Sequence, residues 1–301
     1  MDKDSVNLKI KGDILFDEPM SRHTSFKIGG PADILVFPQD EADIVDILLY
    51  AKSNKIPWCV LGRGTNVLVK DNGVRGIVIN TDRILNKVAI HDNLLEVSAG
   101  ILLPKFVRFT QEIGLSGLEF AVGIPGNIGG VVAMNAGVQD KCIGDFVVRV
   151  WGISENGGKK EWKKEELDFG YRHSIFSIGG NIVTKVELLL EKDSPRVIKE
   201  RIDKYIKKRK KTQPLEYPSA GSVFKNPCDG KFAARLIDMA GCKGLQIGSV
   251  KVSEKHAGFI INLDSLRGTA SDVIFLAAEI QKRVDEKFGV KLEMEMKILG
   301  E

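Results

Sequence analysis

Residues Leu61 to Asn80 read LGRGTNVLVKDNGVRGIVIN, in which an apolar strand runs into the turn GRGTN and then resumes as a strand. Gly62 and Gly64 allow backbone N–H groups to approach an anion closely, so this turn can form a nest for pyrophosphate. It is not a Walker loop, because it lacks the GK[ST] ending, and it is not a GxGxxG turn that opens a helix. Taken alone, the segment also fits an ordinary tight turn.

A second glycine-rich segment, Gly123 to Gly137, reads GIPGNIGGVVAMNAG. Its glycines would let the backbone pack directly against a flat, polar ligand, although they could also serve tight packing alone. Two such segments in one chain favour a bound dinucleotide more strongly than either segment does by itself.

Apolar periodicity predicts three α+β regions, over residues 1–82, 83–205 and 206–301. The first region alternates strand and helix, the second is mostly strand, and the third combines helices with short strands. The expected helices are Asp40–Ser53, Pro104–Ile113, Phe232–Met239 and Ala270–Phe288. The expected strands include Ile34–Phe37, Trp58–Leu61, Asn66–Val69, Ile77–Asn80, Leu94–Ser98, Phe146–Ile153, Ile182–Leu190 and Leu292–Ile298, with a hairpin turn at Asn156 to Gly158.

The composition is that of a soluble globular protein, with 43% hydrophobic and 28% charged residues among 301. No apolar run approaches the roughly 18 residues that cross a bilayer, and the charged N-terminus lacks the apolar stretch of a secretory signal. We therefore expect a cytoplasmic protein with no membrane partner. The cysteines and histidines show no metal-ligand spacing, which predicts reduced thiols and no metal held by side chains. These cysteines are Cys59, Cys142, Cys228 and Cys242.

Seven of the eleven residues from Arg201 to Lys211 are lysine or arginine. Ile198, Ile202, Tyr205 and Ile206 recur at helical spacing, which favours an amphipathic helix with a solvated basic face. Two alternatives are attraction of a diphosphate substrate and binding of nucleic acid. Aromatic residues make up only 7% of the chain and no stacking motif is present, so we expect no nucleic-acid partner. We also expect a monomer.

Three further segments carry candidate chemistry. Residues 218–227 read PSAGSVFKNP and place the Ser222 hydroxyl on a small-residue turn, with Lys225 and Asn226 close behind. Residues 171–176 read YRHSIF, and residues 290–300 read VKLEMEMKILG. With the two glycine-rich segments, these motifs resemble the UDP-N-acetylenolpyruvoylglucosamine reductase family from about Ser21 onward. The chain is similar to the shorter type of that family, because no room for an inserted tyrosine loop lies between Val183 and the basic helix.

This resemblance implies the α+β FAD-binding fold of the vanillyl-alcohol oxidase and p-cresol methylhydroxylase type. FAD would lie between subdomains 1–82 and 83–205, and a substrate domain over 206–301 would return Glu295 to the active site. The residues implied to hold pyrophosphate are Gly62, Arg63, Gly64, Thr65 and Asn66. Those implied to line the rest of the cofactor are Gly123, Ile124, Gly126, Asn127, Gly129 and Gly130.

Some oxidases of this superfamily attach their flavin covalently through histidine or cysteine. No histidine occurs between His23 and His91, and Cys59 precedes the pyrophosphate loop inside a strand. We therefore predict non-covalent FAD, with NADPH as the co-substrate implied by the resemblance.

The implied reaction reduces the enolpyruvyl ether of UDP-N-acetylglucosamine to UDP-N-acetylmuramate, a step of peptidoglycan precursor synthesis. Hydride would pass from NADPH through FAD to the alkene, and negative charge would then build on the adjacent carbon and carboxylate. Arg172 suits the grip on that carboxylate, because a guanidinium is permanently charged and binds it as a fork. The resemblance implies that Ser222 donates the proton and that Glu295 lies beside the developing charge.

Each of these residues has a plainer alternative. Arg172 could form a surface salt bridge, and Glu295 could be an exposed position of its strand, with Glu293 as a competitor for its role. The residues expected at the substrate are Tyr217, Lys225 and Asn226, with Gln213 as a weaker candidate. His256 is expected to be structural, with a hydrogen bond to the backbone. The alternative function is an FAD-dependent sugar or alcohol oxidase of the same superfamily.

Overall fold

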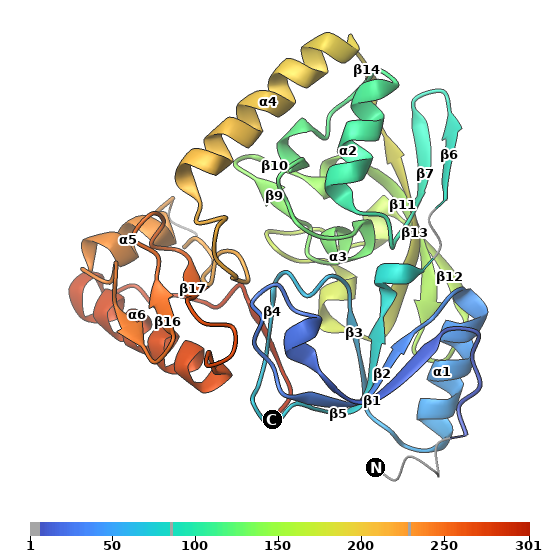
Figure 1. The fold of residues 1–301 in the computed structure, drawn as a ribbon. Helices are drawn as coiled ribbons and strands as arrows, with labels where there is room; N and C mark the ends of the chain where they lie inside the picture. The colour runs from blue at the N-terminus through green and yellow to red at the C-terminus, as the bar shows by residue number, and fades with distance from the viewer. Residues whose placement is uncertain (1–6, 85–86, 228–229) are drawn as a thin grey trace. The chain divides into compact units, whose positions relative to one another are not determined.

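The computed structural model describes residues 7–84, 87–227 and 230–301 (Figure 1). The chain divides into two compact units. Unit 1 holds the described residues up to 16, then 34–63 and 76–208. Unit 2 holds residues 17–33, 64–75 and 209–301. The predicted divisions near residues 82 and 205 stay predictions, and Cys228 lies outside the described residues.

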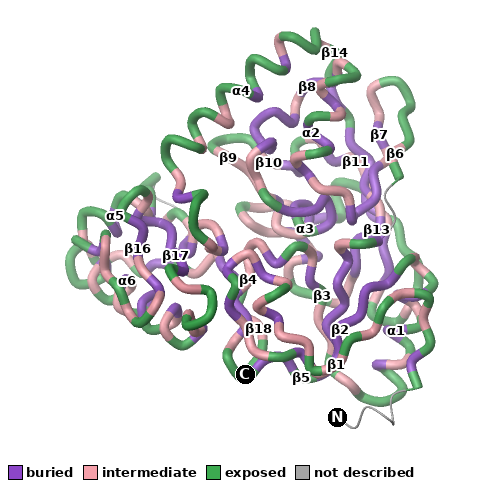
Figure 2. Tube along the Cα trace, in the orientation of Figure 1, coloured by how far each residue is buried: buried purple, intermediate pink, exposed green. Residues whose placement is uncertain are grey.

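The centre of unit 1 is an antiparallel five-stranded sheet in the order β12-β11-β13-β7-β6. Its strands are β6 (Val88–His91), β7 (Leu94–Ser98), β11 (Val147–Ser154), β12 (Lys159–Lys163) and β13 (Asn181–Leu189). The predicted hairpin joins β11 to β12, and Gly157 adopts the positive φ of 78° that this turn requires. Strands β11 and β13 are buried along much of their length (Figure 2).

One face of this sheet is covered by α2 (Leu103–Glu112) and α3 (Ile128–Ala133), which share its hydrophobic core. Helix α2 agrees with the predicted helix to within one residue at each end. Helix α3 was not expected, because Gly129 and Gly130 disfavour a helix interior. The close packing explains one of these glycines: a Cβ at Gly129 would lie 2.9 Å from the Cβ of Ala99.

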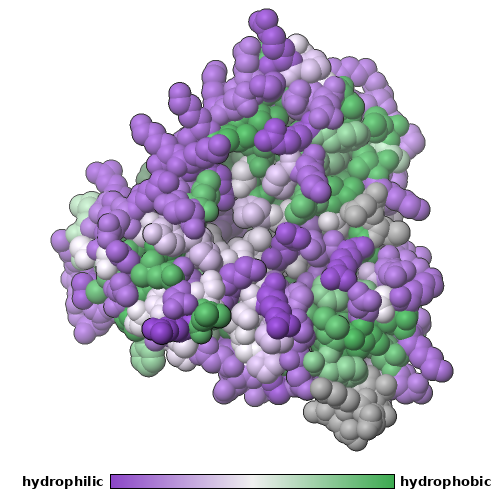
Figure 3. Space-filling model, viewed as in Figure 1, coloured by the Kyte–Doolittle hydropathy of each residue, from purple (hydrophilic) through white to green (hydrophobic). Residues whose placement is uncertain are grey.

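Helix α4 (Pro195–Thr212) confirms the predicted amphipathic helix. Ile198 and Ile202 are buried in the core of unit 1, and hydrophilic side chains gather over α4 (Figure 3). Its Arg201 contacts Glu119, which lies just before the second glycine-rich segment. The buried Glu119 carboxylate accepts hydrogen bonds from the Ser116 hydroxyl at 2.8 Å, the Gly117 N–H at 2.8 Å and Arg201 Nη1 at 3.2 Å. Burial raises the pKa of Glu119, but these donors outweigh burial and hold the pKa below its usual 4.5.

A four-stranded sheet has the order β1-β2-β5-β3, and β3 runs parallel to β5. Its strands are β1 (Asp13–Pro19), β2 (Pro31–Phe37), β3 (Trp58–Leu61) and β5 (Val74–Asn80). Helix α1 (Glu41–Ser53) packs apolar residues against the part of this sheet that belongs to unit 1. Its N-cap is Asp40, whose side chain accepts a hydrogen bond from the Asp43 N–H.

Unit 2 contains α5 (Ala233–Met239), α6 (Ala270–Phe288) and a small antiparallel sheet in the order β15-β16-β17. The strands of that sheet are β15 (Gln246–Ile247), β16 (Val250–Val252) and β17 (Ile260–Asn262). A separate parallel pair joins β4 (Val67–Val69) to β18 (Lys297–Leu299). Of the strand expected over Leu292–Ile298, only the last part is regular. Residues 293–295 instead contact the loop that carries Ser222, through a bridge between Phe224 and Met294.

The remaining strands are short pairs in unit 1. They are β8 (Leu115–Ser116) with β14 (Glu191–Lys192), and β9 (Gly137–Val138) with β10 (Lys141–Cys142).

Candidate active site

The two glycine-rich segments meet in unit 1. Strand β3 ends at Leu61, and a Cβ at the following Gly62 would lie only 2.7 Å from Asn127 Oδ1. Only glycine leaves room for that side chain, so the start of the predicted pyrophosphate turn lies directly against the second segment. This contact supports a common ligand for both segments. Arg63 extends from the same turn and forms a 2.7 Å ion pair with Asp82. The Asp82 carboxylate partly neutralises the positive charge of the Arg63 guanidinium.

Asn127 combines a satisfied acceptor with an unsatisfied donor. Its side chain is 1% exposed, and Oδ1 accepts a 3.2 Å hydrogen bond from the Gly130 N–H, which caps helix α3. Its Nδ2 is buried and has no hydrogen-bond partner among the described residues. A buried donor left unpaired costs about 1–3 kcal/mol. Native proteins keep such groups mainly where a ligand or another function needs them. The segment therefore fits a cofactor with hydrogen-bond acceptors, as FAD is.

Arg172 lies in a strained turn that also belongs to unit 1. The backbone groups of Gly170 and His173 exchange hydrogen bonds of 3.1 and 3.2 Å, with Tyr171 and Arg172 between them. Arg172 has a φ of 55°, at the turn position where glycine is usual. A left-handed backbone costs an L-residue about 1–2 kcal/mol, and such strain concentrates at functional sites.

Three hydrogen bonds attach this turn and its YRHSIF segment to the second glycine-rich segment. Arg172 Nη2 donates to the carbonyl of Gly137 at 3.1 Å, and Ser174 Oγ donates to that of Ala133 at 2.7 Å. Asn135 Nδ2 donates to the carbonyl of Gly170 at 2.9 Å. The sequence reasoning missed Ser174 and Asn135 as supports. The only signal was their short polar side chains, which suit contacts with backbone groups.

In unit 2, the Ser222 loop is anchored as its sequence predicts. Gly221 adopts a φ of 76°, and the following Val223 and Phe224 are 2% and 3% exposed. The Val223 N–H donates to the carbonyl of Gly258 at 2.9 Å. Ser222 itself is half-buried, so its hydroxyl is carried by a rigid loop with part of its surface accessible.

Glu295 lies beside this loop, and the structure separates it from its competitor Glu293. The Glu295 N–H donates to the carbonyl of Val223 at 2.8 Å, and its side chain is half-buried. Glu293 is 73% exposed and forms a 2.7 Å ion pair with Lys225. A solvated ion pair is a poor place for a carboxyl that must act on bound substrate. This contrast favours Glu295 for that role.

The turn residues that belong to unit 2 are also held in place. Gly64 has a φ of 61°, and a Cβ there would lie 2.3 Å from the carbonyl oxygen of His23. Ser25 joins this turn to the Ser222 loop: its N–H donates to Gly64 O at 3.0 Å and its Oγ to Ser219 O at 2.7 Å. Asn66 contacts the closing segment, residues 290–300, with Nδ2 3.2 Å from the Glu295 carbonyl oxygen.

The residues predicted at the substrate differ in their environments. Tyr217 is 42% exposed, while Asn226 Oδ1 accepts a 3.0 Å hydrogen bond from the Ala233 N–H at the start of α5. Gln213 Oε1 is buried without a hydrogen-bond partner among the described residues. A ligand donor could satisfy this acceptor, which favours a ligand contact at this weaker candidate. His256 agrees with its predicted structural role, since Nδ1 accepts a 3.2 Å hydrogen bond from the Gly258 N–H. Burial lowers the pKa of His256 below its usual 6.5.

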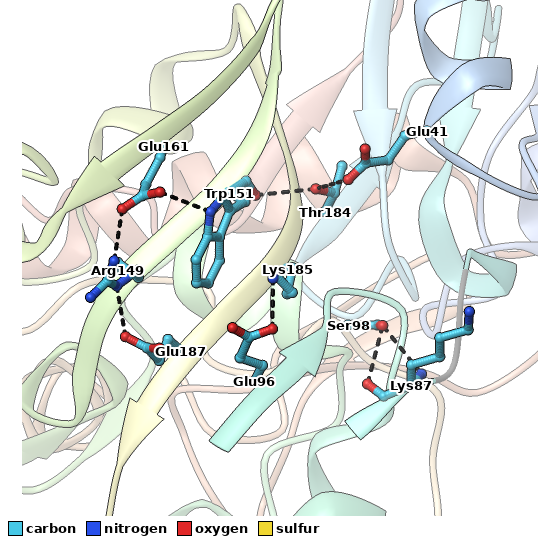
Figure 4. Close-up of polar contacts among 10 residues, drawn as sticks. All are labelled: Glu41, Lys87, Glu96, Ser98, Arg149, Trp151, Glu161, Thr184, Lys185 and Glu187. Atoms are coloured by element: carbon cyan, nitrogen blue, oxygen red, sulfur yellow. Dashed lines mark hydrogen bonds and ion pairs between the residues drawn. The ribbon is translucent and has the colours of Figure 1, made fainter. Parts of the chain in front are cut away.

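A second polar cluster lies on the five-stranded sheet around Trp151 (Figure 4). Arg149 contacts Glu187 at 2.7 Å and Glu161 at 3.0 Å, and Lys185 lies 3.8 Å from the centre of the Trp151 ring. A depression of about 270 Å³ lies at this cluster. Its cations are matched by carboxylates, so we interpret the cluster as a structural network.

Three other findings bear on the sequence predictions. Among the residues described, no three His, Cys, Asp or Glu side chains are grouped so that they could hold a metal ion. No helix in the described chain is long and apolar enough to span a membrane. Burial raises the pKa of the Cys59 thiol to about 11, which makes it a poor nucleophile near the pyrophosphate turn.

Comparison with known proteins supports this assignment of the segments. A family model described as FAD binding domain matches residues 32–158. A model described as UDP-N-acetylenolpyruvoylglucosamine reductase, C-terminal domain, matches residues 213–299. The FAD-binding fold that the resemblance implies is confirmed.

Full-length relatives agree. UDP-N-acetylenolpyruvoylglucosamine reductase of Clostridium perfringens (strain SM101 / Type A) is 44% identical over 96% of this chain and 93% of its own length. That of Moorella thermoacetica is 42% identical over 97% of this chain and 95% of its own length. The crystal structure of the Thermus caldophilus reductase has a TM-score of 0.80 and 35% identity, covering 97% of this chain and 100% of that chain. The chain therefore belongs to the UDP-N-acetylenolpyruvoylglucosamine reductase family.

Proposed function

We propose that this chain reduces UDP-N-acetylglucosamine enolpyruvate to UDP-N-acetylmuramate, with FAD as its cofactor and NADPH as its reductant. Family membership supports the reaction and the cofactor. The geometric observation that carries the proposal is the attachment of Arg172 to Gly137, which ends the second glycine-rich segment. A guanidinium at that position can bind the carboxylate of the substrate while it contacts the segment that we propose to hold the flavin.

FAD held by the two glycine-rich segments would supply the hydride for the terminal alkene carbon, with NADPH as the source of that hydride. The side chains of the chain then handle the charge and the proton. Arg172 holds the carboxylate of the enolpyruvyl group and stabilises the negative charge that builds beside it. Ser222 donates the proton to the adjacent alkene carbon, which bears the carboxylate, and the half-buried Glu295 lies beside the same charge. Hydride and proton together complete the addition across the double bond.

We assign cofactor binding to the two glycine-rich segments. In unit 1 these residues are Gly62, Arg63, Gly123, Ile124, Gly126, Asn127, Gly129 and Gly130, and in unit 2 they are Gly64, Thr65 and Asn66. Asn127 Nδ2 is the donor most in need of a cofactor acceptor. For substrate binding we propose Tyr217, Lys225 and Asn226, of which Asn226 acts by shaping the loop, because its amide oxygen already caps α5.

A spectroscopic experiment tests this function. Protein reconstituted with FAD is mixed anaerobically with NADPH and then with UDP-N-acetylglucosamine enolpyruvate. The visible flavin absorbance should bleach and then return with substrate, and Ser222→Ala should lose the second step only. A flavin that recovers only when air is admitted would indicate an oxidase. A protein that does not bind FAD would refute the cofactor and the catalytic roles together.

A further inference from the structure

Asn66 makes contacts that a role in holding pyrophosphate does not explain. Its Nδ2 donates to the carbonyl of Glu295 at 3.2 Å, and its own carbonyl accepts a 3.0 Å hydrogen bond from the Lys297 N–H. Both partners belong to the closing segment, 229 residues away from Asn66 at Glu295. Asn66 therefore holds peptide groups on both sides of Met296.

The position of Asn66 explains why a side chain is needed there. Strand β18 pairs with β4 only from Lys297, opposite Val67, onward. Glu295 lies two residues before this regular ladder, where pairing with β4 has not yet begun. The amide of Asn66 extends the contact to Glu295 across that gap, because a side-chain N–H can replace the backbone donor that a ladder would supply.

The other peptide group of Glu295 is held by the Ser222 loop. Its N–H donates to the carbonyl of Val223 at 2.8 Å, and Val223 directly follows Ser222. The backbone of Glu295 thus connects the Ser222 loop on one side to Asn66, in the turn GRGTN, on the other. Fixing both the N–H and the carbonyl of one residue restricts its φ and ψ, and so the direction of its Cα–Cβ bond.

We propose that Asn66 is a positioning residue, which fixes the direction of the Glu295 carboxyl relative to Ser222. This inference rests on the proposed function, in which Glu295 lies beside the charge that develops on the substrate. Small misplacements of a catalytic group cost large factors in rate, so a contact of this kind affects the step that uses Glu295. Reduction of the flavin by NADPH does not use Glu295, so loss of the contact between Asn66 and Glu295 should slow reoxidation more than reduction.

The test compares Asn66→Ala with Asn72→Ala, a matched change at an exposed asparagine in the turn that follows β4. Rapid mixing separates flavin reduction by NADPH from flavin reoxidation by UDP-N-acetylglucosamine enolpyruvate. Both steps are measured at saturating FAD, because Asn66 also lies in the turn proposed to hold pyrophosphate. Asn66→Ala should slow reoxidation about tenfold to a hundredfold, and should slow it at least about fivefold more than it slows reduction. In a Glu295→Gln background, Asn66→Ala should add nothing further, because it acts only through Glu295. Amide hydrogen exchange over 293–299 should be faster in Asn66→Ala and unchanged in Asn72→Ala.

Two results would overturn the inference. Multiplicative effects of Asn66→Ala and Glu295→Gln on reoxidation at saturating FAD would show that Asn66 acts independently of Glu295. Unchanged exchange over 293–299 would show that it does not hold the closing segment. Wild-type protein that is not reoxidised by the substrate would refute the proposed function. In that case hydrogen exchange, which needs no substrate, still decides whether Asn66 anchors Glu295.

Discussion

Replacing Asn127 with serine should weaken FAD binding without destabilising the free protein. Serine ranks with asparagine as an N-cap, so the contact with the Gly130 N–H can be kept. The change deletes Nδ2, which is buried and lacks a partner in the described chain. Removing that unpaired donor gains about 1–3 kcal/mol, which roughly offsets the small void that serine leaves. The free energy of unfolding of the free protein should therefore change by less than about 1 kcal/mol.

The cofactor complex should respond differently. With FAD bound, Nδ2 would gain an acceptor, which would relieve the cost of about 1–3 kcal/mol of leaving this buried donor unpaired. Losing about 2 kcal/mol raises the dissociation constant for FAD about thirtyfold, since each 1.4 kcal/mol is a factor of ten. The assay titrates the free protein with FAD and follows flavin fluorescence, and urea unfolding with and without FAD reports stability.

Thr269→Ser is the matched control. It exchanges the N-cap of α6 and keeps an oxygen for the Asp272 N–H, so it should change neither FAD affinity nor stability appreciably. The reasoning is refuted if Asn127→Ser loses more than about 2 kcal/mol of stability while its FAD affinity equals that of the wild type. Asn127 would then be a structural cap whose amide does not contact the cofactor.

Four other changes test features of the site and its support. Arg172→Gly and Arg172→Ala should both lose reoxidation of the flavin by substrate. The free energy of unfolding in urea should be about 1 kcal/mol higher for the glycine variant, because the φ of 55° at this position suits glycine. A more stable alanine variant would contradict the inference that the turn is strained. Glu119→Ala should lower the free energy of unfolding by about 2–3 kcal/mol through its lost hydrogen bonds, whereas the exposed Glu200→Ala should change it by less than about 0.5 kcal/mol, and equal losses would refute the argument. His256 has a pKa lowered from 6.5, so it contributes stability that is fully present above pH 6.5 and is lost as pH falls through the lowered pKa; His256→Gln should flatten the loss measured by urea unfolding between about pH 7 and 5. Gln213→Met, which removes a buried acceptor, should stabilise the free protein by about 1 kcal/mol in thermal unfolding and weaken substrate binding, and a loss of stability would show that Oε1 is satisfied.

Local signals predicted the elements that begin and end at strong caps. Helix α6 was predicted at Ala270–Phe288 and has those bounds, because Thr269 caps its start and Gly289, with a φ of 63°, ends it. Helix α3 was missed because two glycines outweigh its single good cap at Asn127 in any propensity argument. The closing strand was predicted too long, since alternation cannot show that residues 293–295 contact a loop instead of a strand.

The candidate site divides in the same way. Glycine content indicated both candidate cofactor segments, and the family resemblance indicated Arg172, Ser222 and Glu295. The roles of all these residues remain proposals. The supports were beyond prediction, because they depend on pairs far apart in the chain. Asn135 reaches Gly170, and Asn66 reaches Glu295, only after folding has brought their segments together. A single sequence shows the polar side chain but not the carbonyl that it will contact.

The pairing of β18 with β4 can form only after nearly all of the chain has been synthesised. Unit 2 is assembled from three separate stretches of chain, and its parallel pair joins residues more than two hundred positions apart. During synthesis, β4 leaves the ribosome early. Its backbone groups that face β18 stay unpaired until Lys297 to Leu299 have been synthesised. Such long-range contacts slow folding and leave strand edges exposed to wrong partners. Synthesis of Lys297 to Leu299 is therefore the step that lets β4 pair and brings Glu295 to Asn66.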